Sequence, residues 1–126
     1  MIVLDTNALI FWTLNPSDLS KSADSTIQNA DQIIVSAISI WEIGIKSAKG
    51  KLSIGSTLEK YVEALRQVDR VEIQAVDETI WMENVNLKWA HRDPADRTIV
   101  ATAKLLDCEL VTSDREIRSF YKKSVW

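Results

Sequence analysis

The sequence has very few of the residues that interrupt regular structure or build thiolate metal sites. Among its 126 residues it has 3 glycines, 2 prolines, 1 cysteine and 1 histidine. One cysteine excludes an internal disulfide, and one cysteine with one histidine excludes a structural zinc site of the usual kind. Scarce glycine and proline, without repeats or low-complexity segments, also argue against a flexible linker. These absences predict one continuous series of helices and strands.

Long hydrophobic runs are missing as well. No apolar run approaches the roughly 18–20 residues that a helix needs to span a bilayer. The N-terminal segment Met1-Ile2-Val3-Leu4-Asp5 has neither the basic stretch nor the cleavage site of a signal peptide. Together with the unpaired Cys108, this predicts a cytoplasmic protein with no membrane partner.

The overall charge argues at first against a nucleic-acid partner. The net charge is −3, whereas phosphate binding depends on cationic side chains. If four carboxylates are committed to metal ions, however, the remainder carries −3 + 4 = +1. The basic residues also form three local clusters: Lys46, Lys49 and Lys51; Arg92 and Arg97; and Arg115, Arg118, Lys122 and Lys123. Each cluster is either an ordinary solvated surface or a set of phosphate contacts.

Short aliphatic runs alternate with longer helical stretches along the chain. The hydrophobic content of 46% is sufficient for a core, and the length predicts a single domain over residues 1–126. The alternation predicts a three-layer α/β/α fold with a mainly parallel sheet of four to five strands. Strands are expected at 2–5, 33–36, 71–76, 109–112 and, at one edge, 124–126. Helices are expected at 7–13, 20–30, 39–49, 56–68, 77–89, 93–106 and 114–121.

Helix starts and stops support this assignment. Ser20 and Asp77 are expected N-caps, and Ser56 to Glu59 has the pattern of a capping box. Pro94 suits the first position of the helix expected at 93–106, and Gly50 suits the C-terminal cap of the helix expected at 39–49. In the helix at 39–49, one apolar face is expected to contain Ala37, Trp41, Gly44, Ile45 and Ala48.

Acidic side chains stand where the strands of this sheet end. Asp5 follows the first strand and Asp114 follows the fourth, while Glu42 and Asp96 lie in the first turns of helices. Ligands of open parallel sheets bind at the carboxyl ends of the strands. Four carboxylates meeting there would repel one another unless they held protons or a hard cation, and oxygen ligands suit Mg²⁺ or Mn²⁺.

Each acid also has a purely structural interpretation. Asp5 and Asp114 can cap helices, and Asp96 can favour a helix dipole. Glu42 can form an i, i+4 pair with Lys46. The joint placement of the four acids at one edge, rather than any single residue, supports the cation site.

Four segments together resemble the PIN domain, and in particular the VapC-type ribonuclease toxins. They are Leu4-Asp5-Thr6-Asn7, Ser36 to Glu42, His91-Arg92-Asp93-Pro94-Ala95-Asp96-Arg97 and Val111-Thr112-Ser113-Asp114. The resemblance extends from Met1 to about Val125, and the segment from His91 is its most specific part. It implies a PIN-like fold and a metal-dependent nuclease with an acidic set of Asp5, Glu42, Asp96 and Asp114.

The resemblance also implies roles for neighbouring residues. Thr6, Asn7, Ser36 and Thr112 match positions that support the acids, although turn or cap chemistry explains them equally well. Asp93 is expected to cap a helix, and Arg97 to hold an acid or face phosphate. Candidate RNA contacts are Arg92, Arg115 and Lys46. His91 as a catalytic base is a further alternative, although a metal-activated water makes a base unnecessary.

The expected function is therefore metal-dependent hydrolysis of RNA by the toxin of a toxin–antitoxin pair. Family likeness implies products with 5′-phosphate and 3′-hydroxyl ends, a homodimer, and neutralisation by an antitoxin. Trp12 and Trp41 follow the first and second strands and are candidates for the dimer contact. Two alternatives remain. One is a non-catalytic binding module of the same fold. The other is a phosphatase with Asp5 as nucleophile, which is disfavoured because Asn7 stands where its second aspartate is needed.

Overall fold

A five-stranded, wholly parallel sheet forms the centre of the molecule. The computed structural model describes residues 1–126. The strands are β1 (Ile2–Leu4), β2 (Ile33–Ser36), β3 (Val71–Gln74), β4 (Glu109–Val111) and β5 (Ser124–Val125), in the order β3-β2-β1-β4-β5. In the register of the sheet, Val3 pairs with Ile34 on one side and Leu110 on the other. The predicted α/β/α fold with a parallel sheet is confirmed, and every strand pair is parallel.

Helices connect the strands at nearly the predicted positions. They are α1 (Thr6–Leu14), α2 (Lys21–Asn29), α3 (Ala37–Ala48), α4 (Leu58–Arg66), α5 (Glu78–Asn86), α6 (Pro94–Leu106) and α7 (Arg115–Phe120), with a 3₁₀ turn η1 (Pro16–Asp18). Ser20 and Asp77 are N-caps as predicted. Gly50, with φ of 70°, follows the end of α3 as expected.

Two predicted helix boundaries were wrong. The N-cap of α4 is Thr57 rather than Ser56, because the Thr57 hydroxyl accepts a hydrogen bond from the backbone of Lys60. Helix α5 ends at Asn86 rather than near Trp89. Residues 87–93 instead form a connecting loop before Pro94, whose ring favours the start of a new helix.

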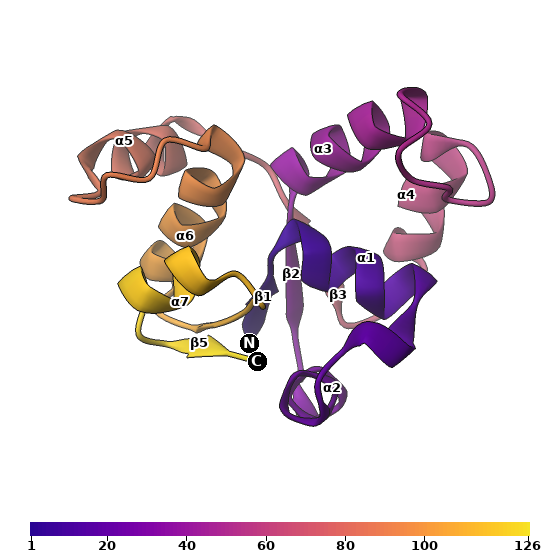
Figure 1. Cartoon of the computed structure of the whole chain (residues 1–126), viewed down its shortest axis with the longest axis horizontal. Helices are drawn as coiled ribbons and strands as arrows, with labels where there is room; N and C mark the ends of the chain where they lie inside the picture. The colour runs from indigo at the N-terminus through magenta and orange to yellow at the C-terminus, as the bar shows by residue number, and fades with distance from the viewer.

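The sheet separates two hydrophobic cores. Side chains alternate across β1, so that Ile2 and Leu4 enter one core and Val3 enters the other. The first core includes residues of α1, α2, α3 and α4, and the second includes residues of α5, α6 and α7. Figure 1 shows these two groups on opposite sides of the strands, the first in indigo to pink and the second in orange to yellow.

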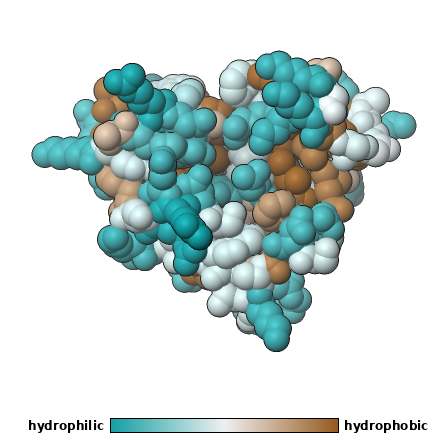
Figure 2. All heavy atoms as spheres, viewed as in Figure 1, coloured by the Kyte–Doolittle hydropathy of each residue, from teal (hydrophilic) through white to brown (hydrophobic).

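The parallel arrangement places the carboxyl ends of the strands along one edge. In Figure 1, β1 rises from the N-terminus and α1 begins at its upper end. Figure 2 shows a hollow between two lobes at this upper edge. This edge is where Asp5, Asp114 and the start of α3 come together in the fold. None of the helices combines the length and apolar character needed to cross a membrane.

The buried face of α3 differs from the predicted one. Ser39 and Ile43 are completely buried, whereas Trp41 is 58% exposed. Helical spacing alone does not distinguish these faces, because both contain apolar residues. The face that turns inward is the one on which Ile43 joins the first core and Ser39 contacts Thr6 of α1. Gly44 lies under α4, where an added Cβ would approach Leu58 to 2.8 Å.

This correction gives a direct test of the fold. We expect Ile43→Ala to lower the free energy of unfolding by about 2–5 kcal/mol, because it leaves a cavity in a closed core. Trp41→Ala should change it by less than about 1 kcal/mol in the monomeric chain. Urea unfolding at a concentration where the chain is monomeric measures both. The reverse ranking would show that the originally predicted face is the buried one.

Candidate active site

Asp5 occupies the junction between β1 and α1 and is 4% exposed. Its Oδ1 accepts a hydrogen bond of 2.7 Å from the backbone of Ala8, which makes Asp5 the N-cap of α1. Its Oδ2 accepts a hydrogen bond from the hydroxyl of Thr112, which follows β4. Both oxygens are therefore fixed, one by its own helix and one by the neighbouring strand.

Burial makes ionisation of Asp5 costly. Desolvation raises the pKa of Asp5 to about 6, and the carboxylates of Asp96 and Asp114 raise it further, while the hydrogen bonds from Thr112 and Ala8 oppose the shift. Like charges that are buried near one another disfavour simultaneous ionisation. A positive ion at this position would favour the charged state of all three groups.

Asp96 and Asp114 approach Asp5 from two helix starts. Asp96 lies in the first turn of α6, where its carboxylate is 2.8 Å from Nε2 of His91. Burial raises the pKa of Asp96, and the charges of Asp93 and Asp114 add to this shift. Asp114 caps α7 by accepting from the backbones of Glu116 and Ile117. The three aspartates are thus electrostatic neighbours.

Glu42 lies at the side of this group. The hydroxyl of Thr6 donates to Oε1 of Glu42 and also lies 2.9 Å from the hydroxyl of Ser39. This polar contact connects the first turn of α1 to α3, so that Glu42 is held close to the residue that follows Asp5. Glu42 and Lys46 form no ion pair, so the structural interpretation of Glu42 as half of an i, i+4 pair is not supported.

The donor set suits a hard divalent cation in its chemistry. The charged groups that neighbour one another at the edge are the carboxylates of Asp5, Asp96 and Asp114, and Mg²⁺ and Mn²⁺ prefer carboxylate ligands. No three Asp, Glu, His or Cys side chains already surround a single point closely enough to ligate one ion. The fit therefore rests on the chemistry of the donors and on the raised pKa values of two neighbouring acids.

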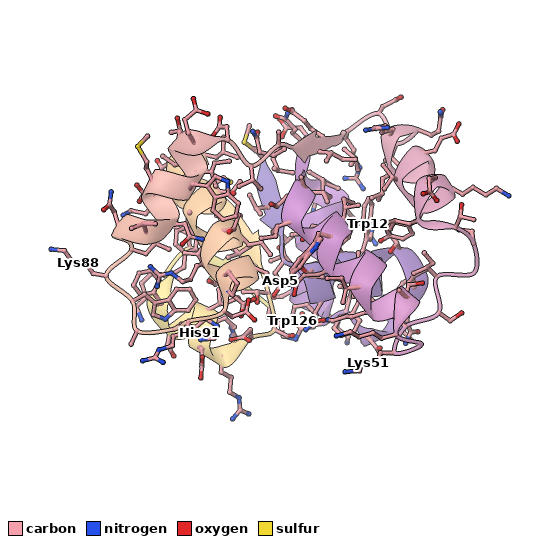
Figure 3. All side chains as sticks on the ribbon, turned by 90° about the horizontal axis from the view of Figure 1, so that it is seen from above. Asp5, Trp12, Lys51, Lys88, His91 and Trp126 are labelled. Carbon is pink, nitrogen blue, oxygen red and sulfur yellow. The ribbon has the colours of Figure 1, made fainter.

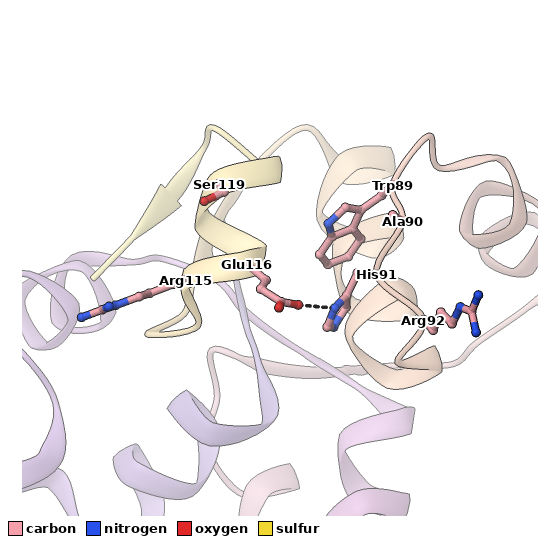
Figure 4. Close-up of a pocket in the computed structure, with 7 residues that line it drawn as sticks. All are labelled: Trp89, Ala90, His91, Arg92, Arg115, Glu116 and Ser119. Carbon is pink, nitrogen blue, oxygen red and sulfur yellow. Dashed lines mark ion pairs between the residues drawn. The ribbon is translucent and has the colours of Figure 1, made fainter.

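His91 connects the acidic edge to the loop before α6. Nε2 of His91 contacts Asp96, and Nδ1 forms an ion pair with Glu116 of α7 (Figure 4). The Trp89 ring stacks on His91 at a centroid distance of 4.6 Å, and its other face stacks on Phe120 at 4.7 Å. The contact with Asp96 raises the pKa of His91. Both ring nitrogens are engaged with carboxylates, which favours a role in holding Asp96 over one as a free catalytic base.

Comparison with known proteins identifies the family of this chain. The model of the PIN domain family matches residues 2–123. The chain belongs to the PIN domain family. Among curated proteins it is similar to Ribonuclease VapC22 of Mycobacterium tuberculosis, with 29% identity over 119 residues that cover 94% of this chain and 90% of the relative. The resemblance to VapC-type toxins is thereby confirmed.

Solved structures share the fold of this PIN domain. A toxin–antitoxin complex from Klebsiella pneumoniae superposes with a TM-score of 0.71 and 20% identity, covering 100% of this chain and 97% of the other. VapC20 of Mycobacterium tuberculosis, described as a toxin that cleaves the sarcin–ricin loop, gives a TM-score of 0.68 and 13% identity, with 94% of each chain covered. At these identities the likeness supports the fold alone.

Arg97 of the PIN domain has different partners from those expected. Its guanidinium donates to no carboxylate. It donates instead to four backbone carbonyl oxygens, those of Asn84, Leu87, Trp89 and His91, at 2.6–3.1 Å. Arg97 therefore fixes the loop of residues 87–93, and so acts on Asp96 only through the position of His91.

The other predicted supporting residues divide into two groups. Thr6 and Thr112 contact the acids directly, and Asp93 caps α6 by accepting from the backbone of Asp96. Ser36 caps α3 rather than contacting Glu42. Asn7 is exposed and forms no hydrogen bond with an acid.

Seen from above the carboxyl ends of the strands, Asp5 lies between the two halves of the PIN domain (Figure 3). His91 lies on the side formed by α6 and α7, and Trp12 on the side of α1. Of the candidate RNA contacts, Arg92 and Arg115 line one pocket with His91. Lys46 belongs to α3 on the opposite side of the edge.

Three residues of the site were not predicted. Ser39 was missed, although its spacing of three from Glu42 places both on one side of a helix. Glu116 was missed because its partner His91 belongs to a distant segment of the chain. Trp89 was not among the predicted site residues, whereas its ring supports His91.

The raised pKa of Asp5 predicts that stability falls with pH when no metal is present. The folded protein retains the Asp5 proton between about pH 4 and pH 6 while the unfolded chain loses it, so stability decreases across this window. Asp5→Asn should make this decrease smaller, leaving the part that comes from the raised pKa values of Asp96 and His91, and should stabilise the chain by up to about 3 kcal/mol at pH 7. Urea unfolding in EDTA from pH 4 to 7 measures both. Equal pH profiles for the variant and the wild type would contradict the raised pKa.

The contacts of Arg97 predict that the loop of residues 87–93 becomes less ordered when Arg97 is replaced. Arg97→Gln should lower the free energy of unfolding by about 2 kcal/mol, because partly buried carbonyl groups lose charged donors. Hydrogen exchange should accelerate in residues 87–91 more than elsewhere. The exposed Arg118→Gln is the matched control and should change neither quantity. Unchanged exchange in the loop of Arg97→Gln would show that the loop is ordered by other contacts.

Proposed function

We propose that residues 1–126 form a single-domain, divalent-cation-dependent endoribonuclease that acts as the toxin of a toxin–antitoxin pair. The observation that supports this most strongly is the group of three neighbouring aspartates, Asp5, Asp96 and Asp114, at the carboxyl edge of the sheet in a chain of the PIN family. The similarity to a protein named as a VapC ribonuclease supports RNA as the substrate.

The acids would hold Mg²⁺ or Mn²⁺, with Glu42 at the side of the group. When bound, such an ion supplies Lewis-acid chemistry and lowers the pKa of water, which allows phosphodiester hydrolysis near neutral pH. Thr112 orients Asp5 toward the edge, and His91 orients Asp96. Hydrogen-bonded partners of this kind fix carboxylates and strengthen metal binding.

A toxin needs a partner that silences it, and the surface has an apolar groove suited to one. The groove lies between α1 and α4, encloses about 490 Å³ and is lined mostly by hydrophobic residues, including Trp12, Ile54 and Tyr61. Figure 2 shows a broad hydrophobic area on this side of the molecule. We infer an antitoxin segment as its occupant, because a structure of the same fold was solved as a toxin–antitoxin complex.

Exposed aromatic and aliphatic side chains support the expected homodimer. Trp41 of α3 and Trp81, Met82 and Val85 of α5 are 45–77% exposed. Large apolar side chains gathered on exposed helices are typical of protein interfaces. Trp12, by contrast, is partly buried against the first core and lines the groove, so it is better placed for the antitoxin than for the dimer.

Cleavage of RNA by the purified chain tests the proposal. Free of antitoxin, it should cut a structured ribosomal RNA with Mg²⁺ or Mn²⁺ and lose activity in EDTA. Asp96→Asn should reduce the rate more than 100-fold, because an essential charge is removed from the transition-state environment. Asp69→Asn, an exposed aspartate outside the site, is the control and should cleave at the wild-type rate.

Metal binding provides an independent measurement. Mn²⁺ should raise the melting temperature of the wild type, because a ligand that binds only the folded state stabilises it, and Asp96→Asn should lose most of this increase. Cleavage that persists in both EDTA and Asp96→Asn would contradict the assignment. Absent cleavage together with a normal Mn²⁺ response would favour the non-catalytic binding module instead.

A further inference from the structure

A second pocket lies beside the acidic edge and has no part in the proposed hydrolysis. It encloses about 560 Å³ between α7 and the loop of residues 87–93 (Figure 4). Its lining consists of Trp89, Ala90, His91, Arg92, Arg115, Glu116 and Ser119. The ion pair between His91 and Glu116 crosses the space between the two walls. Because His91 also contacts Asp96, the pocket is one side chain away from the acids.

The walls of this pocket combine apolar and polar groups. The edge of Trp89 and the methyl group of Ala90 form the wall contributed by the loop, while Ser119 and Glu116 face it from α7. The size falls in the range of roughly 300–1,000 Å³ that small-molecule sites occupy. A planar heterocycle with polar edges, such as a nucleobase, matches this combination better than an aliphatic side chain does.

The cationic groups stand on opposite sides of the pocket. Arg115, at the start of α7, extends away on one side, and Arg92, in the loop, extends away on the other (Figure 4). Both side chains are exposed. A nucleotide within a strand has one phosphate on each side of its base. Two arginines on opposite sides of the pocket therefore match a strand that passes over it, with one phosphate at each arginine.

We propose that this pocket binds one unpaired nucleotide of the RNA strand next to the bond that is cut. The base enters between Trp89 and Ser119, and the two flanking phosphates contact Arg92 and Arg115. That the bound strand is RNA rests on the proposed function. The existence of the pocket and the positions of its charged residues are independent of it. Since a base enters only when it leaves its stack, the site selects single-stranded over duplex RNA.

Binding measured without cleavage tests the pocket. The probe is a fluorescein-labelled, unstructured RNA of ten nucleotides containing all four bases, and the comparison is the same strand in a duplex. Fluorescence anisotropy is measured in EDTA. The wild type should bind the single strand about tenfold more tightly than the duplex, because only an unpaired base can enter the pocket and hydrogen bonds to its edges contribute on this scale.

Two variants fill the pocket from its opposite walls. Ser119→Leu and Ala90→Leu, combined, should weaken binding of the single strand about tenfold and leave duplex binding unchanged. Both positions are exposed, so the fold should be retained. Ser22→Leu, the same change at an exposed serine of α2, is the control and should bind like the wild type.

The salt dependence tests the two arginines separately from the pocket. Arg92→Gln and Arg115→Gln should each reduce the slope of log Kd against log salt by about 0.7, the value for one lost phosphate contact on a single strand. Arg118→Gln, on the same helix but outside the lining, should leave the slope unchanged.

The possible outcomes separate this inference from the proposed function. The pocket proposal is wrong if the double variant Ser119→Leu/Ala90→Leu binds the single strand as tightly as the wild type does. It is also wrong if both arginine variants keep the wild-type salt slope. Either result would count even if metal-dependent cleavage is intact. The converse outcome is that RNA binding responds as expected in all these variants and yet the chain never cleaves RNA. That result would support the nucleotide-binding pocket and reject the proposed nuclease activity.

Discussion

The fold and the candidate site both depend on the burial of a carboxylate at the end of β1. Asp5 ends the central strand, begins α1 and is fixed by a hydroxyl from the neighbouring strand end. The cap and the site acid are therefore the same group, rather than alternatives. The helix benefits from a negative cap, but burial beside two other aspartates opposes ionisation. A cation at this edge, as proposed above, would resolve that conflict.

Three of the four acids of the site are held by a residue from another element, whereas Asp114 is fixed by the backbone of its own helix. Thr6 of α1 holds Glu42 of α3, Thr112 holds Asp5, and His91 holds Asp96. His91 is in turn fixed by Glu116 and Trp89. Sites are most precisely positioned when their side chains are supported by rigid neighbours. The loop of residues 87–93 has no regular structure of its own, and it owes its shape to the guanidinium of Arg97.

Most of the fold could be predicted from the sequence because it depends on local signals. Buried strands appear as aliphatic runs, and helix starts are marked by Asp5, Asp77, Asp93 and Asp114. The inward face of α3 could not be predicted, since apolar residues occupy both of its faces. The end of α5 was also hidden, because Leu87 and Trp89 continue the hydrophobic pattern beyond the last helical turn.

The acids themselves were predictable, whereas the contacts that hold them were not. Strand ends and the PIN resemblance indicate Asp5, Glu42, Asp96 and Asp114. The partners of Arg97 are backbone carbonyls, which leave no trace in side-chain patterns. The contact between His91 and Glu116 joins two segments whose proximity depends on the strand order.

The most direct test of the account is a crystal structure of the chain grown with Mn²⁺, in which anomalous scattering locates the ion. The account predicts one strong peak among the carboxylates of Asp5, Asp96 and Asp114. No peak there at saturating Mn²⁺, or occupancy only at other positions, would contradict the central claim that this buried acidic edge is a cation site.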